Sequence, residues 1–141
     1  MTDQRMPEPP LGDLALVPGR AVDLLALALP LAPVAPSDVE EGEPRAGSRG
    51  LIRPGRPGSP GPDNLDSPDS TGGELGVWTL EPGVVTDVEI DETFVVIAGR
   101  GTVEIEGGPA EELRPGILMS LTAGMRTRWT ITETLRKVYL L

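Results

Sequence analysis

The sequence contains no cysteine and no histidine, and only four of its 141 residues are aromatic. Without cysteine the chain cannot form a disulfide, and without cysteine or histidine it cannot form a Cys/His zinc site. The lack of histidine also excludes a Ser-His-Asp triad and any histidine general base. The length allows one domain of ordinary size.

Basic residues are also scarce, with 12 Lys and Arg against 22 Asp and Glu, which gives a net charge of −10. This charge repels phosphate backbones, so we expect no nucleic-acid partner. The apolar segment 21–29 is shorter than the ~20 residues that cross a bilayer, and it matches a secretory signal poorly. We therefore expect no membrane partner and a cytoplasmic location.

Proline is scarce in the second half of the chain, because 13 of the 16 prolines precede residue 74. Proline cannot donate a hydrogen bond to a strand ladder, so a sheet must lie mostly after residue 73. The sequence predicts four parts. These are a flexible tail (1–20), an N-terminal arm that packs on the barrel (21–53), a disordered loop rich in Pro and Gly (54–73) and a β-barrel (74–141).

Short segments with strand-like patterns fill the last part, and glycine-containing turns separate them. They span residues 75–80, 84–90, 93–98, 102–106, 117–121, 126–132 and 135–141. Seven short strands with turn signals between them predict an all-β sandwich or small barrel.

Two spacings in this series resemble the motifs of the cupin family. Glu92, six residues and Gly99 resemble the second half of the first cupin motif, and Pro82-Gly83 resembles its opening turn. Gly116, Gly124 and Thr127 have the spacing of the second motif. The resemblance implies a cupin-type double-stranded β-helix, which is a jelly-roll barrel, with an irregular N-terminal arm.

A more specific resemblance covers both ends of the barrel segment. Gly76-Val77-Trp78 at the start, and Trp129 followed by residues 133–139 (ETLRKVY), resemble the cupins related to ureidoglycine aminohydrolase and to ethanolamine utilisation. The segment 41–46 resembles the arm that precedes that domain, and residues 54–73 resemble an insertion.

The family's metal ligands fall on unsuitable residues in this chain. In metal-binding cupins two histidines, a glutamate and a third histidine hold the metal, and the spacing places these positions at Thr86, Val88, Glu92 and Thr127. Only the glutamate is retained, and valine offers no donor atom. We therefore expect no metal and no cofactor, and the family's metal-dependent chemistry does not carry over.

Strand alternation assigns the candidate site residues to faces. The side chains expected to line a barrel pocket are Trp78, Thr86, Val88, Phe94, Met119, Thr127, Trp129, Lys137 and Tyr139. If Glu92 points inward, so do Phe94 and Val96, and Trp129 shares a face with Thr127 and Ile131.

Glu92 is the candidate catalytic residue. An acid on an apolar strand needs a partner, and Lys137, Tyr139 or an arginine could provide it. A structural role for Glu92 therefore competes with a role as general acid or base. Similarly, an ion-paired Lys137 competes with a Schiff-base amine.

Three functions remain open. The chain could be a metal-free cupin that binds a small polar metabolite in the barrel or acts without catalysis. It could instead be a metal-independent lyase, isomerase or hydrolase that uses Glu92 as acid or base. It could also be a structural subunit, and the resemblance implies a homodimer. The sequence leaves open whether the protein is an enzyme.

Overall fold

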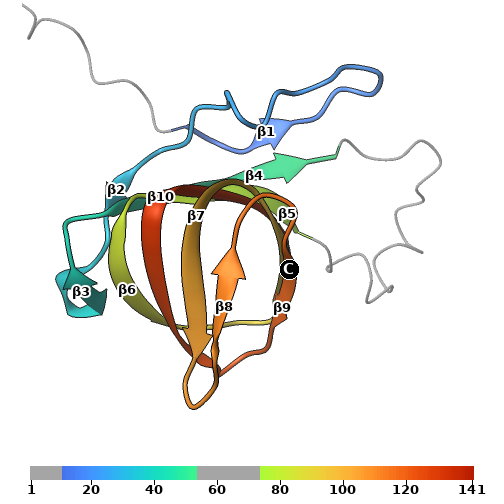
Figure 1. The fold of residues 1–141 in the computed structure, drawn as a ribbon. Coiled ribbons are helices and arrows are strands. Elements are labelled where there is room, and N and C mark those ends of the chain that lie inside the picture. Colours follow the sequence, from blue (N-terminus) through green and yellow to red (C-terminus); the bar gives the residue numbers. More distant parts are fainter. Residues whose placement is uncertain (1–10, 54–73) are drawn as a thin grey trace, which may run out of the picture.

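The computed structural model describes residues 11–53 and 74–141, which form ten strands around one barrel (Figure 1). The first ten residues and the expected loop 54–73 lie outside the described residues. The strands are β1 (Leu14–Ala15), β2 (Ala32–Pro33), β3 (Val39–Glu41), β4 (Arg45–Ile52), β5 (Leu75–Leu80), β6 (Gly83–Val88), β7 (Glu92–Ile105), β8 (Ala110–Leu113), β9 (Leu118–Leu121) and β10 (Arg126–Leu140). A 3-10 turn, η2 (Pro36–Asp38), precedes β3.

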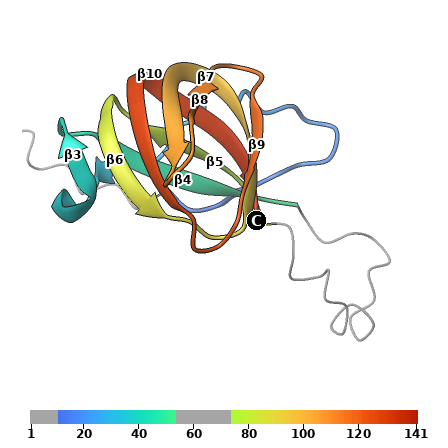
Figure 2. The ribbon, with the colours of Figure 1, turned by 60° about the horizontal axis from the view of Figure 1, so that its bottom comes forward.

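The two longest strands, β7 and β10, pair antiparallel with each other, and the other barrel strands pair with one of these two. The first half of β10 pairs with β6, and its second half pairs with β5. On the far edge, the first half of β7 pairs with β9 and its second half pairs with β8. The sheet therefore curls into a barrel (Figures 1 and 2), and the predicted all-β jelly-roll fold is confirmed.

Each long strand was predicted as two short ones: 93–98 and 102–106 for β7, where Gly99 was read as a strand end, and 126–132 and 135–141 for β10. Strand β7 continues through Gly99, which has a φ of +98°, and the β7–β10 register shifts nearby. Inward side chains have even numbers before this point (Phe94, Val96) and an odd number after it (Val103). The irregularity thus exchanges the faces of β7 without breaking the ladder, whereas the inward residues of β10 keep odd numbers from Thr127 to Lys137.

The N-terminal arm is part of the sheet. Strand β4 pairs with β5 from Ala46 to Leu51, and β1 and β2 pair with β4. Strand β3 extends the other end of the sheet by pairing with β6. Strand β1 falls within the segment 1–20 that was expected to be a flexible tail. Its parallel pairing with β4 orders that part of the segment.

Arginine side chains fasten this arm to the barrel. Arg136 of β10 donates to the carbonyl oxygens of Leu24 at 2.7 Å and Leu27 at 2.8 Å. Arg49 of β4 donates to the carbonyl oxygens of Gly12 and Ala28. Each guanidinium thus joins segments of the arm that lack long strands of their own.

The apolar core lies inside the barrel. Its fully buried members include Leu80, Phe94, Val96, Val103, Leu113, Leu121 and Leu135, with Trp129 and Ile131 beside them. The predicted inward faces of 92–96, 127–131 and 135–139 are confirmed, since these positions carry the buried side chains. Within the described ranges, no helix is long and apolar enough to cross a membrane.

Candidate functional site

A cavity of about 330 Å³ opens beside the core, between β5, β6, the start of β7, β10 and the arm. It is lined by the candidate catalytic residue Glu92 and by five of the predicted pocket residues, which are Trp78, Thr86, Trp129, Lys137 and Tyr139. The arm adds Val34, Asp38, Ala46 and Ser48, none of which sequence reasoning placed there. The cavity is near the lower end of the roughly 300–1,000 Å³ typical of ligand sites, which suits a small metabolite.

Lys137 and Glu92 form a buried ion pair in the cavity wall. The Lys137 ammonium lies 2.5 Å from Oε2 of Glu92, and the side chains are only 5% and 10% exposed. Burial lowers the pKa of Lys137, and the charge of Glu92 acts against this shift. Of the partners considered for Glu92, the structure selects Lys137.

Three aromatic rings surround the same ammonium group. The Nζ of Lys137 lies 4.5 Å from the ring centroid of Trp78, 4.3 Å from that of Phe94 and 4.9 Å from that of Trp129. The rings of Trp78 and Trp129 also contact each other, with centroids 5.7 Å apart. Cation–π attraction and the ion pair together hold the buried charge.

Sequence reasoning missed Glu89, which is 7% exposed and also lines the cavity. Its Oε2 accepts hydrogen bonds from the Thr127 hydroxyl at 2.7 Å and from Nε1 of Trp129 at 3.3 Å. Desolvation raises the pKa of Glu89, and these two hydrogen bonds oppose the shift. A carboxyl group with a raised pKa beside a cavity can exchange protons with a ligand.

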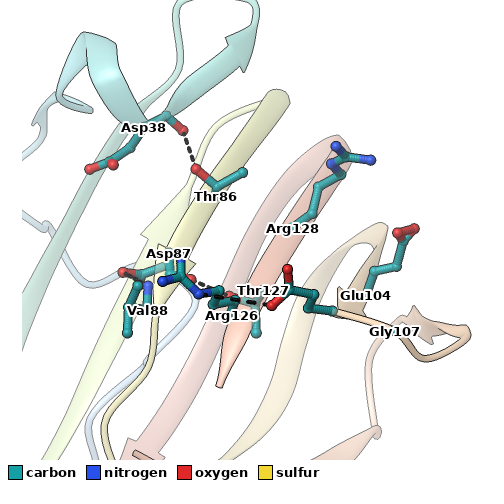
Figure 3. A pocket seen from close by; sticks show the side chains of 10 residues that line it. Asp38, Thr86, Asp87, Val88, Glu104, Gly107, Arg126, Thr127 and Arg128 are labelled. Atoms are coloured by element: carbon teal, nitrogen blue, oxygen red, sulfur yellow. Dashed lines mark hydrogen bonds and ion pairs between the residues drawn. The ribbon is translucent and has the colours of Figure 1, made fainter. Parts of the chain in front are cut away.

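Asp87 lies at the boundary between this cavity and an outer cleft of about 510 Å³. Figure 3 shows this cleft, which Asp87 of β6 lines together with Arg126 and Arg128 of the neighbouring strand β10. Burial raises the pKa of Asp87, and the nearby carboxyl of Asp38 adds to the shift. The outer cleft gives solvent a route to Asp87.

The remaining predicted pocket residues lie outside the cavity lining. The side chain of Val88 is 58% exposed and borders the outer cleft, so its predicted place in the pocket is wrong. Met119 of β9 packs against the core instead. Phe94 lies in the core beneath Lys137, and Thr127 is buried and positions Glu89.

Comparison with known proteins identifies the family of this chain. The family model described as the EutQ-like cupin domain matches residues 69–139, half of the chain. The chain belongs to the EutQ-like cupin family. No match was found among curated proteins.

Solved cupin structures share this fold. A protein of unknown function from Pseudomonas syringae pv. tomato is 25% identical with a TM-score of 0.61, over 84% of this chain and 46% of that one. Ectoine synthase from P. lautus is 20% identical with a TM-score of 0.51, over 67% of this chain and 62% of its own. The EutQ protein of Clostridium difficile is 13% identical with a TM-score of 0.53, over 85% of this chain and 83% of its own. This chain thus spans about half to two thirds of the first two.

The cupin register explains why Glu89 and Asp87 were missed. Counting back from Glu92 placed the family's first two ligand positions at Thr86 and Val88. In the structure Val85 and Glu89 are buried, and Asp87, which lies between them on the same face, lines the cavity together with Thr86. Across the turn between β6 and β7 the inward positions change from odd to even numbers. This change can be recognised only when the strand that pairs with β6 is known. The apolar Val85, two residues before Asp87, was the available signal.

Proposed function

We propose that this cupin works without a metal and binds a small polar molecule in the barrel cavity. The observation that supports this most directly is the ion pair of Glu92 with Lys137. Glu92 is the one residue that the cupin motif retains from its metal-ligand set, and here a built-in ammonium group neutralises it. The open volume next to this pair, with aromatic and carboxyl groups around it, provides a binding site.

The donor set does not fit the metal that the family implies. The inward positions of β6 carry Val85 and Asp87, and the sequence has no imidazole to offer. Across residues 11–53 and 74–141, the structure contains no cluster of three His, Cys, Asp or Glu arranged to hold a metal ion. Transition metals in such sites favour imidazole together with carboxylate, and one carboxylate already paired with lysine is a poor replacement.

Metal analysis and ligand binding test this proposal together. We expect protein purified without chelators to contain Mn, Fe, Ni and Zn far below one atom per chain. Trp78 and Trp129 are the only tryptophans, and both line the cavity, so a bound metabolite should change the intrinsic fluorescence. A stoichiometric metal that leaves only when the protein unfolds would overturn the metal-free proposal.

A metal-independent enzyme is the second candidate, and the structure favours Glu89 over Glu92 as its acid or base. Glu92 is held by Lys137, whereas Glu89 has a raised pKa and no lysine or arginine partner in the described parts of the chain. In any turnover assay, Glu89→Gln should therefore reduce kcat more than Glu92→Gln does. The opposite order would restore Glu92 to the role predicted from the sequence.

Two further predictions stay open. Resemblance of 76–78 and 133–139 to the ureidoglycine aminohydrolase group supports a place for this chain near that group. The fold resemblance supports a homodimer, and sedimentation at micromolar concentration showing only monomer would count against it.

A further inference from the structure

We infer that the barrel cavity selects a small organic cation, such as an alkylammonium group, and that Asp87 and Glu89 bind its charge. This inference rests on the proposed function, because it needs the cavity to be a ligand site. It adds the chemical class of the ligand and two residues that recognise it.

The charges around the cavity are unequal. Its lining includes four carboxyl groups, from Asp38, Asp87, Glu89 and Glu92, and a single basic group, from Lys137. The ion pair of Glu92 with Lys137 uses that basic group. In the described residues, no lysine or arginine comes within ion-pair distance of Asp87 or Glu89. The cavity therefore presents uncompensated negative charge to whatever enters it.

The basic groups of the outer cleft do not compensate this charge. Arg128 is engaged by Glu40, with its Nε 3.0 Å from one carboxylate oxygen and Nη2 3.2 Å from the other. The Nε of Arg126 lies 3.8 Å from Oε1 of Glu106. Both arginines are thus oriented toward glutamates at the outer rim.

Glu89 is held in position for an external partner. Its Oε2 accepts hydrogen bonds from Thr127 and Trp129, and the Thr127 hydroxyl also accepts one from Nε1 of Trp129 at 3.0 Å. Within the described residues Oε1 of Glu89 takes part in no hydrogen bond. One oxygen is therefore anchored to the wall, and the other remains for a ligand that donates a proton or carries positive charge.

The aromatic lining favours an organic cation over a hydrated metal ion. Trp78, Trp129 and Tyr139 line the cavity beside the two carboxyl groups. Indole faces attract weakly hydrated cations, and the Lys137 ammonium already lies against both indole rings, those of Trp78 and Trp129. A second cation would meet repulsion from Lys137, but the adjacent Glu92 carboxylate screens it.

Access to the two carboxyl groups is provided by the outer cleft. Asp38, Thr86 and Asp87 border both the cleft and the cavity (Figure 3). A ligand would therefore meet the partly solvated Asp87 first and Glu89 further inside. This order makes Asp87 the residue whose charge attracts the ligand.

Binding of a cation by Asp87 and Glu89 should also depend on pH. Burial raises the pKa of both Asp87 and Glu89, so protons compete with a cationic ligand for them. The other charged and titratable groups of the cavity are Asp38, Glu92, Lys137 and Tyr139, and on the side of the outer cleft Asp87 also shares the lining with Glu104, Glu106, Arg126 and Arg128. Affinity for a cation should therefore rise with pH above the usual carboxyl pKa of about 4.

The test compares cations with uncharged and anionic molecules of the same shape. The probes are n-butylammonium, choline, 3,3-dimethylbutan-1-ol, which is the neutral isostere of choline, and butyrate. Binding to the full chain is followed by tryptophan fluorescence and by calorimetry. We expect at least one cation to bind about tenfold more tightly than the neutral alcohol or butyrate. Asp87→Asn and Glu89→Gln should each weaken that cation about tenfold.

The control is Glu111→Gln, which changes an exposed carboxyl group of β8 outside the cavity. It should leave affinity unchanged, and circular dichroism should show all three variants folded. If the alcohol or butyrate binds as tightly as the cations, the inference is wrong and the binding proposal stands. If neither these probes nor a metabolite library produce any signal, both fail.

Discussion

The ion pair of Glu92 and Lys137 neutralises one buried charge with a buried charge of the opposite sign. Glu92 is an inward residue of β7, two positions before Phe94. Lys137 is an inward residue of β10 and lies opposite Val96 in the ladder. The ammonium is fixed by a carboxylate and three rings, so neither charge is exposed alone. Such a pair is costly to break but adds little net stability over apolar residues.

Breaking this pair from one side should destabilise the barrel strongly. Glu92→Leu leaves the buried ammonium without its partner, and Lys137→Met leaves the carboxylate. We expect each to lower the free energy of unfolding by about 3–5 kcal/mol. The double variant should lose less than the sum of the two, because no unpaired charge remains. Urea unfolding of the four proteins measures the coupling.

A matched cycle on the exposed pair of Arg126 and Glu106, 3.8 Å apart, provides the control. Solvent screening should leave it without measurable coupling. Additive losses at Glu92 and Lys137 would show that the two side chains act independently.

Glu89 should give the protein a pH-dependent stability. Its pKa is raised in the folded state, so the folded protein holds this proton more tightly than the unfolded chain does. The stabilisation is complete below the unfolded glutamate pKa of about 4.3, and it is lost as the pH rises through the folded value. The isosteric variant Glu89→Gln cannot lose a proton in this way.

The measurement is the difference in unfolding free energy between Glu89→Gln and the wild type as a function of pH. This difference should shift in favour of the variant as the pH rises from about 4 to neutral. Asp87, whose pKa is also raised, remains in both proteins and largely cancels. A flat difference would mean that Glu89 has an ordinary pKa.

At the scale of elements, the bulge around Gly99 explains what the sequence could and could not predict. Strand β5 was predicted with its bounds, and the inward faces of the first half of β7 and of both halves of β10 were also correct. The continuity of β7 was not predictable, because a glycine at a bulge and a glycine at a turn have the same local pattern. The partner strand decides between them.

The same limit applies to the arm and to the cavity. Strands of two or three residues such as β1, β2 and β3 carry too little pattern to detect, and β4 contains two glycines that weaken its strand signal. The arm side chains in the cavity wall depend on these pairings. Glu89 was missed for a related reason, since the turn before β7 sets the faces of β6.

Substitution at Gly99 should test the bulge. A Cβ there would lie 2.3 Å from the carbonyl oxygen of Thr134 and 2.5 Å from the Cα of Leu135, on a backbone with a φ of +98°. Gly107 has a similar φ of +82°, but a Cβ there meets nothing within 4 Å. Gly107→Ala therefore measures the backbone strain alone, about 1–2 kcal/mol.

Gly99→Ala should cost about 1–3 kcal/mol more than this control, because the backbone of β10 must move away. Thermal and urea unfolding of both variants provide the comparison. Equal losses for the two variants would show that β10 can yield at the bulge, so that the bend is not a fixed feature of the barrel.

On the scale of the whole molecule, the end of β4 and the start of β5 are neighbours in the sheet although 23 residues separate Leu51 from Leu75. Strand β4 ends beside the start of β5, where Leu51 pairs with Leu75. The segment between them, 52–74, contains the stretch 54–73 that the sequence predicts to be an inserted loop. Two hydrogen-bonded neighbours in an antiparallel ladder need only a short turn to connect them.

Replacing 54–73 with Asn-Gly should therefore preserve the barrel and stabilise it. Closing a loop of five residues instead of 23 lowers the entropic cost by about 1 kcal/mol, since that cost grows with the logarithm of length. The unfolding free energy should rise by this amount, and cation affinity in the cavity should stay unchanged. A control with 54–73 scrambled keeps the length and should match the wild type. Loss of stability in the shortened protein, with the scrambled one intact, would mean that β4 and β5 need the longer connection to reach their register. Loss in both would mean that the segment makes sequence-specific contacts with the fold.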